Sequence, residues 1–482
     1  MRVVVLVTVT LLAGAVALLV RPRPPHLAGP VTGDPALAAD LRRAVGDPDG
    51  HRALAVAAID PSGVRFAGIG DRGDGGPVTQ DTPFEIGSVT KGLTGMLLAD
   101  RIAAGTVAPG DPLRAALPAV SGPVGDVTLA ELASHRAGLP SVPPGFGSYL
   151  GSIRGADPYA GQDLDWLLRA VGGTSPGGTR GTMHYSNIGA ALLGQALAAK
   201  AGVSYEQLLR ERVLTPIGMT ATTITPDGAA LPAGHASGST AAGRRTDAWQ
   251  GSGWAPAGVG VWSTAADLAR LVVALRDGTA PGADAAEPRF DAGEQDRIGY
   301  GWFTTRFDNM TLTWHNGGTG GFRAYVGLDR ASGRGVVVLG NTDRSVTALG
   351  QRLLGATPTT GEPGPDGLGA LRGPLAVVLA FAGALGLLAT VFLAAHGRSD
   401  RVRLASSAVW SLVLLFAAYR VGDWLTAPGW LWSAGATVTA LALCLAALRW
   451  HSLPLVAGRP WWRWTAAAVS AACAALAAWA VA

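Results

Sequence analysis

Two side chains, Ser88 and Lys91, have the types and spacing needed for covalent chemistry. They stand three residues apart at the start of a helix expected over 88–104, so both would lie on one face of it. A serine hydroxyl becomes nucleophilic when a neighbouring group takes its proton, and a partly desolvated lysine can do so. The common alternative is a helix-capping serine followed by a lysine in solvent. The spacing alone does not decide between these two interpretations.

A second candidate segment, MHYSNIG, contains Tyr185 and Asn187 directly before a helix expected over 187–201. A phenol can transfer protons, and a side-chain amide can donate and accept hydrogen bonds. The simpler interpretation is that Ser186 or Asn187 caps the helix while the tyrosine packs against its neighbours.

A third segment, TLTWHNGGTGGFRAYVGLD, spans 311–329. It predicts a strand as far as His315, then a glycine-rich turn, then a second strand over 322–329. Taken alone, it is a glycine-rich hairpin.

In this order, the three segments resemble the serine hydrolase superfamily of class C β-lactamases, D-alanyl-D-alanine carboxypeptidases and related esterases. That superfamily carries S-x-x-K, then Y-x-N, then K-T-G or H-x-G on a strand. Here the matching residues are Ser88-Val89-Thr90-Lys91, Tyr185-Ser186-Asn187 and His315-Asn316-Gly317. ELASHRAGLP (131–140) and PAGVGVWSTAADLARLV (256–272) also resemble superfamily segments. The resemblance covers about 45–355.

The resemblance implies a reaction and a task for each residue of the first two motifs. Ser88 would attack a carbonyl carbon and form an acyl-enzyme. Lys91 and Tyr185 would share the proton transfers. Asn187 would orient the end of Lys91 and bind the substrate amide.

The third motif would form the other wall of the site. The resemblance implies that His315 and Gly317 lie in the substrate site. It also implies that the backbone N–H groups of Ser88 and Gly318 form an oxyanion hole. His315 stands where a penicillin-handling relative usually carries lysine, and histidine is mostly neutral near pH 7. We therefore expect an esterase or peptidase rather than an efficient β-lactamase.

The expected fold class is α+β. We predict a β-lactamase/transpeptidase-like domain with an antiparallel sheet flanked by helices and a helical subdomain. A strand pair, a mainly helical middle and a second group of strands indicate that both ends of the domain contribute to the sheet. The expected strands are 53–60, 64–71, 299–305, 311–315, 322–329 and 334–340, with further helices over 128–135, 204–213, 263–276 and 345–354.

The chain also predicts a membrane region. Charged residues make up 15% of it, against about a quarter in soluble domains. Four apolar stretches, at about 374–395, 404–419, 430–448 and 465–482, have the composition of membrane-spanning helices. The predicted organisation is a signal peptide or signal anchor (1–20), a proline-rich linker (21–37), the hydrolase domain (38–355), a second linker (356–371) and a membrane region with about four transmembrane helices (372–482).

The charge distribution favours one orientation in the membrane. Residues 372–482 hold eight arginines and two aspartates, a net charge of +6, so the remainder of a chain of +4 carries −2. The arginines concentrate in the connections 396–403 and 449–464, which the positive-inside rule places in the cytoplasm. The hydrolase domain would then lie outside, in a multi-pass protein of the cell membrane. A basic surface for nucleic acid is not indicated.

Metal and cofactor chemistry have no support in the sequence. Both cysteines, Cys444 and Cys473, fall in the apolar tail, and the eight histidines are scattered. We therefore expect neither a metal site nor a cofactor.

The sequence thus predicts a membrane-anchored extracytoplasmic serine hydrolase that acts through a Ser88 acyl-enzyme. Its partners would be the lipid bilayer and a small ester, amide or D-amino-acid peptide, which includes cell-wall peptides. Two alternatives stay open: an acylation-dependent membrane sensor and a non-catalytic cell-wall peptide-binding protein. The motifs are intact, which argues against loss of chemistry. The choice between esterase, D-alanyl-D-alanine carboxypeptidase and β-lactamase also stays open.

Overall fold

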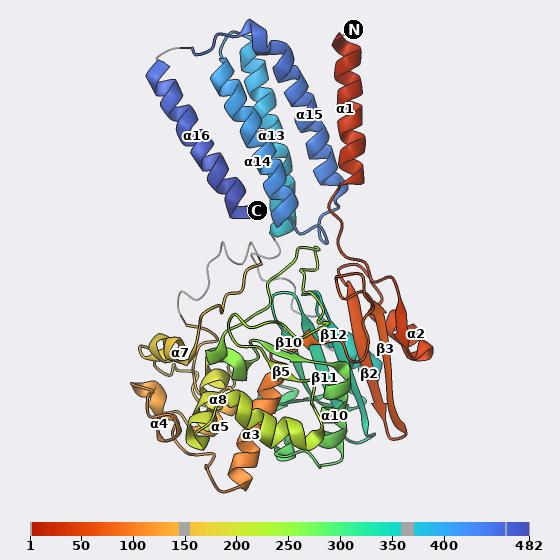
Figure 1. Ribbon diagram of the computed structural model, residues 1–482, viewed down its shortest axis with the longest axis vertical. Coiled ribbons are helices and arrows are strands. Elements are labelled where there is room, and N and C mark those ends of the chain that lie inside the picture. Colours follow the sequence, from red (N-terminus) through yellow and green to blue (C-terminus); the bar gives the residue numbers. More distant parts are fainter. Residues whose placement is uncertain (1, 144–154, 358–370, 458–459, 482) are drawn as a thin grey trace. The chain divides into compact units, whose positions relative to one another are not determined.

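The computed structural model describes residues 2–143, 155–357, 371–457 and 460–481, and the chain divides into two compact units (Figure 1). The larger unit comprises His26–Thr240 and Arg245–Glu362. The smaller unit comprises Met1–Pro25, Ala241–Arg244 and Pro363–Ala482.

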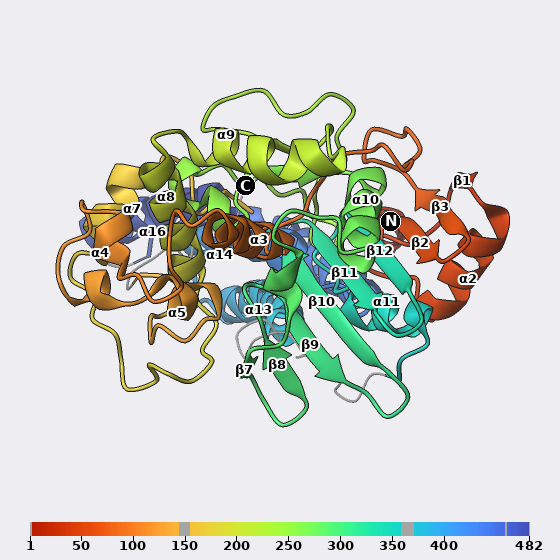
Figure 2. The same ribbon diagram turned by 90° about the horizontal axis from the view of Figure 1, so that it is seen from below.

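A nine-stranded antiparallel sheet forms the centre of the larger unit, in the order β1-β3-β2-β12-β11-β10-β9-β8-β7 (Figure 2). The early strand β2 pairs with the late strand β12, from Leu54 opposite Gly340 to Ile59 opposite Gly335. This pairing confirms that both ends of the domain build the sheet. The strands are β1 (Val31–Gly33), β2 (Ala53–Asp60), β3 (Gly63–Gly70), β7 (Phe290–Asp291), β8 (Asp296–Ile298), β9 (Phe303–Arg306), β10 (Thr311–Gly318), β11 (Arg323–Asp329) and β12 (Arg334–Gly340).

Helices cover both faces of this sheet. Along β2, Ala55 and Ala57 face a core shared with α3 (Val89–Ala103) and α10 (Ala265–Arg276). Leu54 and Val56 face the opposite core, which is shared with α2 (Pro35–Val45) and α11 (Thr347–Leu354). A strand buried on both faces reads as a nearly continuous apolar run. This explains the sequence ALAVAAID in β2.

The helical subdomain is arranged around α8 (Asn187–Ala201), which is buried from Ile188 to Ala198 and packs against α3. The side chain of Ser186 caps its first turn, and Gly202 ends it in the left-handed region at φ 71°. The other helices of the subdomain are α4 (Leu113–Ala116), α5 (Leu129–Ala133), α7 (Leu164–Val171) and α9 (Tyr205–Leu209).

A second, three-stranded sheet in the order β4-β6-β5 was not predicted. It consists of β4 (Phe84–Glu85), β5 (Thr223–Ile224) and β6 (Val261–Ser263). Strands of two or three residues leave little periodicity to detect. The sheet nevertheless matters for the site, because β4 leads directly into Ser88.

The predicted proline-rich linker 21–37 is wrong beyond Pro25. Residues from His26 onward belong to the larger unit. Strand β1 pairs with β3, the Asp34 carboxylate caps α2 at the amide of Leu37 (2.9 Å), and the Thr32 hydroxyl donates to the carbonyl of Val78 (2.7 Å). The prolines concealed a short edge strand and a helix with Pro35 in its first turn, a position that proline favours.

Four helices in the described part of the smaller unit are long and apolar enough to cross a membrane. They are α13 (Arg372–Ala395), α14 (Arg401–Val421), α15 (Trp430–Arg449) and α16 (Pro460–Val481), and they match the four predicted stretches. A shorter apolar helix, α1 (Arg2–Leu19), precedes the larger unit in the sequence.

Helix α1 packs antiparallel against α15. Its Ala17 carbonyl accepts a hydrogen bond from the hydroxyl of Ser433 (2.9 Å). One turn earlier, Gly14 lies so close to Thr437 that an added Cβ would be 3.0 Å from the threonine hydroxyl. Small residues of this kind allow helix backbones to approach closely in membranes.

A buried carboxylate joins the two arginine-rich connections of the smaller unit. Asp400 is fully buried and caps α14 at the amide of Arg403 (2.8 Å). It also accepts from the amide of Ala457 (3.2 Å) and lies 3.5 Å from the guanidinium of Arg463. The connections that precede α14 and α16 therefore lie at the same end of the helical unit.

Candidate active site

Ser88 stands at a tight turn between β4 and α3. Gly87 enters this turn at φ 50°, a conformation that glycine adopts without strain. The turn also has a close neighbour, because a Cβ on Gly258 would lie 2.0 Å from the Gly87 carbonyl oxygen. Ser88 occupies the N-cap position, yet its side chain makes no capping hydrogen bond and is partly exposed. Its hydroxyl is therefore not occupied in capping α3.

Lys91 is directed at that hydroxyl. Its Nζ donates to Ser88 Oγ (2.8 Å) and to the carbonyl oxygen of Ala257 (2.7 Å), and the residue is 2% exposed. This burial penalises the ammonium form and lowers the pKa of Lys91 to about 7. The alternative of a solvated surface lysine is excluded. Above pH 7 the amine is mostly neutral and has a lone pair that can accept a proton.

Tyr185 lies next to both Ser88 and Lys91. The Nζ of Lys91 is 5.0 Å from the centre of its ring. Burial raises the pKa of Tyr185 above its ordinary value, and the neighbouring Ser88 hydroxyl offsets only part of this shift. The phenol is thus a neutral proton donor rather than a phenolate. Of the two candidates for the base, the arrangement favours Lys91.

The ring of His135 packs against the ring of Tyr185. The two ring centres are 4.4 Å apart, and Nδ1 of His135 accepts from the backbone N–H of Ser186 (3.2 Å). The imidazole is therefore protonated on Nε2. Burial, with the charges of Lys91 and His315, holds the pKa of His135 well below its usual value. His135 has φ 57°, a conformation uncommon outside glycine and one associated with functional sites.

The other two residues of the Y-x-N motif, Ser186 and Asn187, make different contacts. Ser186 caps α8 by accepting from the amide of Gly189 (3.0 Å), as the simpler interpretation predicted. Asn187 donates from Nδ2 to the hydroxyl of Ser141 (3.2 Å). Within the described residues, no hydrogen bond joins Asn187 to Lys91. The expected orientation of Lys91 by Asn187 is therefore not made through a hydrogen bond, and this role, like binding of a substrate amide, stays a prediction.

Strand β10 packs against the Ser88 turn through its terminal glycines. A Cβ on Gly317 would lie 1.9 Å from the carbonyl oxygen of Ile86 and 3.1 Å from the amide nitrogen of Ser88. A Cβ on Gly87 would lie 2.7 Å from the amide nitrogen of Gly318. Only glycine permits this approach. It brings the amides of Ser88 and Gly318 next to each other, as an oxyanion hole requires.

His315 lies next to this site but is completely buried. Its Nδ1 donates to the carbonyl oxygen of Asn316 (2.5 Å), and its ring centre is 6.4 Å from that of Tyr185. Burial, with a smaller contribution from the charge of Lys91, lowers the pKa of His315 to about 3. The residue is thus neutral at any physiological pH. Direct contact of His315 with a substrate stays a prediction.

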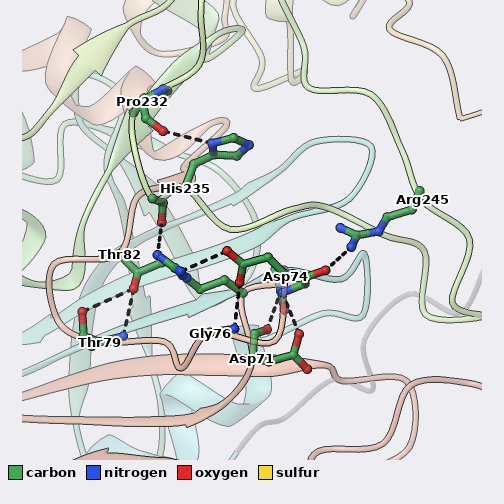
Figure 3. A network of polar contacts seen from close by, with 12 residues as sticks. Asp71, Asp74, Gly76, Thr79, Thr82, Pro232, His235 and Arg245 are labelled. Atoms are coloured by element: carbon green, nitrogen blue, oxygen red, sulfur yellow. Dashed lines mark hydrogen bonds and ion pairs between the residues drawn. The ribbon is translucent and has the colours of Figure 1, made fainter.

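A polar network joins Gly234 and Arg245 to the turn that follows β3 (Figure 3). The guanidinium of Arg72 lies 3.0 Å from the carboxylate of Asp74 and donates to the carbonyl of Gly234 (3.3 Å). The guanidinium of Arg245 donates to the carbonyl of Gly73. These contacts fix the chain that leads to Trp249, near the end of β10.

Comparison with known proteins identifies the class. The fold matches a class C β-lactamase from Rhodobacter sphaeroides with a TM-score of 0.56, covering 67% of this chain and all of that chain at 23% identity. D-alanyl-D-alanine-carboxypeptidase/endopeptidase AmpH of Escherichia coli K12 is 32% identical over 213 residues, which are 42% of this chain and 53% of AmpH. Penicillin-binding protein 4 of Amycolatopsis lactamdurans is 28% identical over 305 residues, 57% of this chain and 76% of that protein.

These similarities define a serine hydrolase of the β-lactamase superfamily. The sequence model of the Beta-lactamase family matches residues 41–355, and the chain belongs to that family. The alignment with AmpH spans about half of that protein's length.

Two further residues contact the catalytic side chains and were not identified from the motifs. The carbonyl of Ala257, which accepts from Lys91, is 166 residues from it; Ala257 lies within the segment 256–272 that resembled the superfamily, but a backbone acceptor has no side-chain signature. His135 lies within the segment that resembled the superfamily, but its contact with Tyr185 depends on the fold.

Proposed function

We propose that this chain is a membrane-anchored, extracytoplasmic serine hydrolase. It would act through a Ser88 acyl-enzyme on a small ester, an amide or a D-amino-acid peptide. One observation carries the proposal: a buried amine whose pKa is near 7 donates a 2.8 Å hydrogen bond to a partly exposed serine hydroxyl. This arrangement gives the serine a base close to its operating pH.

Acylation begins with attack of Ser88 Oγ on the substrate carbonyl carbon. The hydroxyl proton passes to the neutral Lys91 amine as the new C–O bond forms. The amides of Ser88 and Gly318 stabilise the charge on the carbonyl oxygen. The neutral Tyr185 phenol gives its proton to the leaving group and recovers one from Lys91, so the bond to the leaving group breaks without a net change in the enzyme's protons.

Deacylation follows the same path with water as the nucleophile. Lys91 and Tyr185 remove a proton from water while its oxygen attacks the acyl carbon. The departing Ser88 oxygen recovers a proton. The products are the free acid and the original enzyme.

The neutral state of His315 argues against a penicillin as the preferred substrate. A neutral imidazole supplies no fixed positive charge for the carboxylate of a penicillin. The names of two relatives, a carboxypeptidase/endopeptidase and a penicillin-binding protein, support a cell-wall peptide as one candidate substrate. We expect turnover of esters or D-alanyl-D-alanine peptides to exceed turnover of penicillins.

The full chain in detergent tests the proposal directly. Three substrates are compared for wild type and Ser88→Ala: p-nitrophenyl acetate, a peptide that ends in D-Ala-D-Ala, and a fluorescent penicillin. Serine-dependent turnover of either of the first two supports a hydrolase. A stable penicillin adduct without any turnover would favour the acylation sensor instead.

The proposed orientation places the hydrolase unit outside the cell membrane. One end of the helical unit contains the start of α1 and the connections that Asp400 joins. The order of the helices along the chain assigns seven arginines to that end or to the chain next to it. It assigns four arginines to the opposite end. The positive-inside rule then assigns the first end to the cytoplasm. The two sets are Arg2, Arg398, Arg401, Arg403, Arg449, Arg459 and Arg463, against Arg21, Arg23, Arg372 and Arg420.

We predict that α1 is retained as a signal anchor. The Ser433 hydrogen bond to Ala17 and the close approach at Gly14 give it a place beside α15. An N-terminal epitope tag should therefore remain on the mature protein in immunoblots. Leu18→Ala/Val20→Ala creates an A-x-A cleavage pattern and serves as the control that loses the tag. Loss of the tag from the wild type would show that α1 is a cleaved signal peptide.

Gly317→Ala is expected to lower turnover by about 10²-fold, because the new Cβ would displace β10 from the Ser88 turn and misalign one oxyanion donor. Overpacking should also cost about 1–3 kcal/mol of unfolding free energy. Turnover and thermal melting check both effects. Gly110→Ala, where an added Cβ meets nothing within 4 Å, is the matched control. Near-normal turnover in Gly317→Ala would contradict the proposed oxyanion hole.

A further inference from the structure

Glu85 is a buried carboxyl group to which the mechanism above gives no task. It lies three residues before Ser88 and is 1% exposed. Both of its oxygens have partners: Oε1 accepts from the backbone N–H of Trp249 (2.7 Å), and Oε2 lies 2.6 Å from the hydroxyl of Thr319. Burying a carboxyl group is costly, so its specific partners need an explanation.

These contacts join three parts of the site. Glu85 belongs to β4, which carries the chain into the nucleophile turn. Thr319 directly follows Gly318, the expected second oxyanion donor. Trp249 belongs to the segment that continues from the network of Figure 3. One carboxyl group thus connects the nucleophile segment, the oxyanion turn and the segment that contains Trp249.

The backbone hydrogen bonds of Thr319 stay within its own β10–β11 hairpin. Its amide donates to the carbonyl of Phe322 (3.1 Å), and its carbonyl accepts from the guanidinium of Arg323 (2.8 Å). The hydroxyl contact with Glu85 instead crosses to the segment that carries Ser88. A small shift of this turn would move the Gly318 amide relative to the Ser88 amide, and oxyanion stabilisation depends strongly on such geometry.

We propose that Glu85 is a positioning residue that sets the Gly318 amide of the oxyanion hole through the Thr319 hydroxyl. This inference rests on the proposed hydrolase function.

The protonation state of Glu85 gives a readout that packing alone would not. Burial raises the pKa of Glu85 to about 8, and the charge of Asp157 adds to the shift. Below pH 8 the group is mostly the neutral acid and can donate to Thr319. Above pH 8 a carboxylate would place a negative charge on the group that contacts Thr319, next to the expected oxyanion donor Gly318, and would oppose the charge of the oxyanion.

Three substitutions test the two hydrogen bonds of Glu85 separately. Thr319→Val removes the hydroxyl and preserves the shape of the side chain. Glu85→Leu removes both hydrogen bonds. Glu85→Gln keeps an oxygen for the Trp249 amide and an NH₂ group for Thr319, so it imitates the neutral acid. Asp157→Asn is the matched control, because Asp157 accepts from the amide of Gln250 (2.6 Å), next to Trp249, and has no hydrogen bond with Thr319.

The substitutions are compared in the full chain by kcat, by KM for p-nitrophenyl acetate and by the rate at which a fluorophosphonate labels Ser88. We expect Thr319→Val and Glu85→Leu to lower kcat and the labelling rate by about 10-fold to 10²-fold, with little change in KM. The wild type should lose activity above about pH 8, whereas Glu85→Gln should retain most activity at pH 7 and lack this decline. Asp157→Asn should keep a near-normal kcat.

Several outcomes would overturn the inference. Normal kcat and labelling in Thr319→Val would remove the proposed link, even if Glu85→Leu fails to fold. An equal loss of kcat in Asp157→Asn would assign the effect to the segment of Trp249 and Gln250 instead. If the wild type labels at Ser88 but does not turn over, the hydrolase proposal fails while the labelling rates still judge Glu85. A wild type that shows neither labelling nor turnover overturns both proposals.

Discussion

Ser88→Ala is expected to lower turnover of every substrate by at least about 10⁴-fold. No other described hydroxyl receives the Lys91 hydrogen bond, so no second nucleophile can replace it in this geometry. Initial rates with p-nitrophenyl acetate at pH 8 measure the effect. The fold should persist, since Ser88 makes no capping bond to α3.

A matched serine variant separates chemistry from structure. Ser62 lies exposed in the turn between β2 and β3, and Ser62→Ala should leave turnover unchanged. Thermal melting of both variants should resemble that of the wild type. Residual turnover above about 1% in a pure sample of Ser88→Ala would mean that another group performs the reaction.

Lys91→Met is expected to lower turnover by about 10³-fold, because it removes the base and leaves a side chain of similar length. Wild-type activity should rise as pH increases through about 7, since the ammonium form of Lys91 has no lone pair for the Ser88 proton. The variant should lack this rise. Lys200→Met, at the exposed end of α8, changes the chain's other lysine and should leave the pH profile intact.

Lys91→Met should lose turnover without losing stability. Desolvation lowers the pKa of Lys91 from 10.5 to about 7 in the folded protein. Between these values the unfolded chain binds more protons, so the lysine's contribution to stability is lost as pH falls from 10.5 toward 7. Lys91→Met should therefore melt at or above the wild-type temperature at pH 7. A clear drop would indicate that Lys91 is a structural residue rather than a strained catalytic one.

Local spacing accounts for the contact at the chemical core of the site, although it did not by itself exclude a capping serine beside a solvated lysine. Ser88 and Lys91 lie one helical turn apart, so their contact follows from helix geometry alone. Tyr185 lies 97 residues further along the chain, and its place beside Ser88 came from the ordered motifs rather than from any periodicity. The burial of Lys91, which decides its pKa, could not be read from a sequence in which lysine is usually exposed.

The predictions from the sequence fail mainly at strand ends and at contacts between residues far apart in the chain. Strand β10 continues past His315 to Gly318, because glycines allow it to touch the Ser88 turn. Strand β9 begins at Phe303 rather than 299, since Gly301 forms a turn at φ 73°. The link from Glu85 to Thr319 joins residues 234 positions apart, and no local pattern predicts it.

Mapping the covalent adduct shows directly whether Ser88 is the nucleophile. The full chain is treated with a fluorophosphonate, digested with trypsin and analysed by mass spectrometry. Cleavage after Arg72 and Lys91 releases peptide 73–91, in which Ser88 is the single serine. We predict one phosphonyl group on this peptide, assigned to Ser88 by its fragments and absent after Ser88→Ala. An adduct on any other residue, or none while esters are still hydrolysed, would contradict the account.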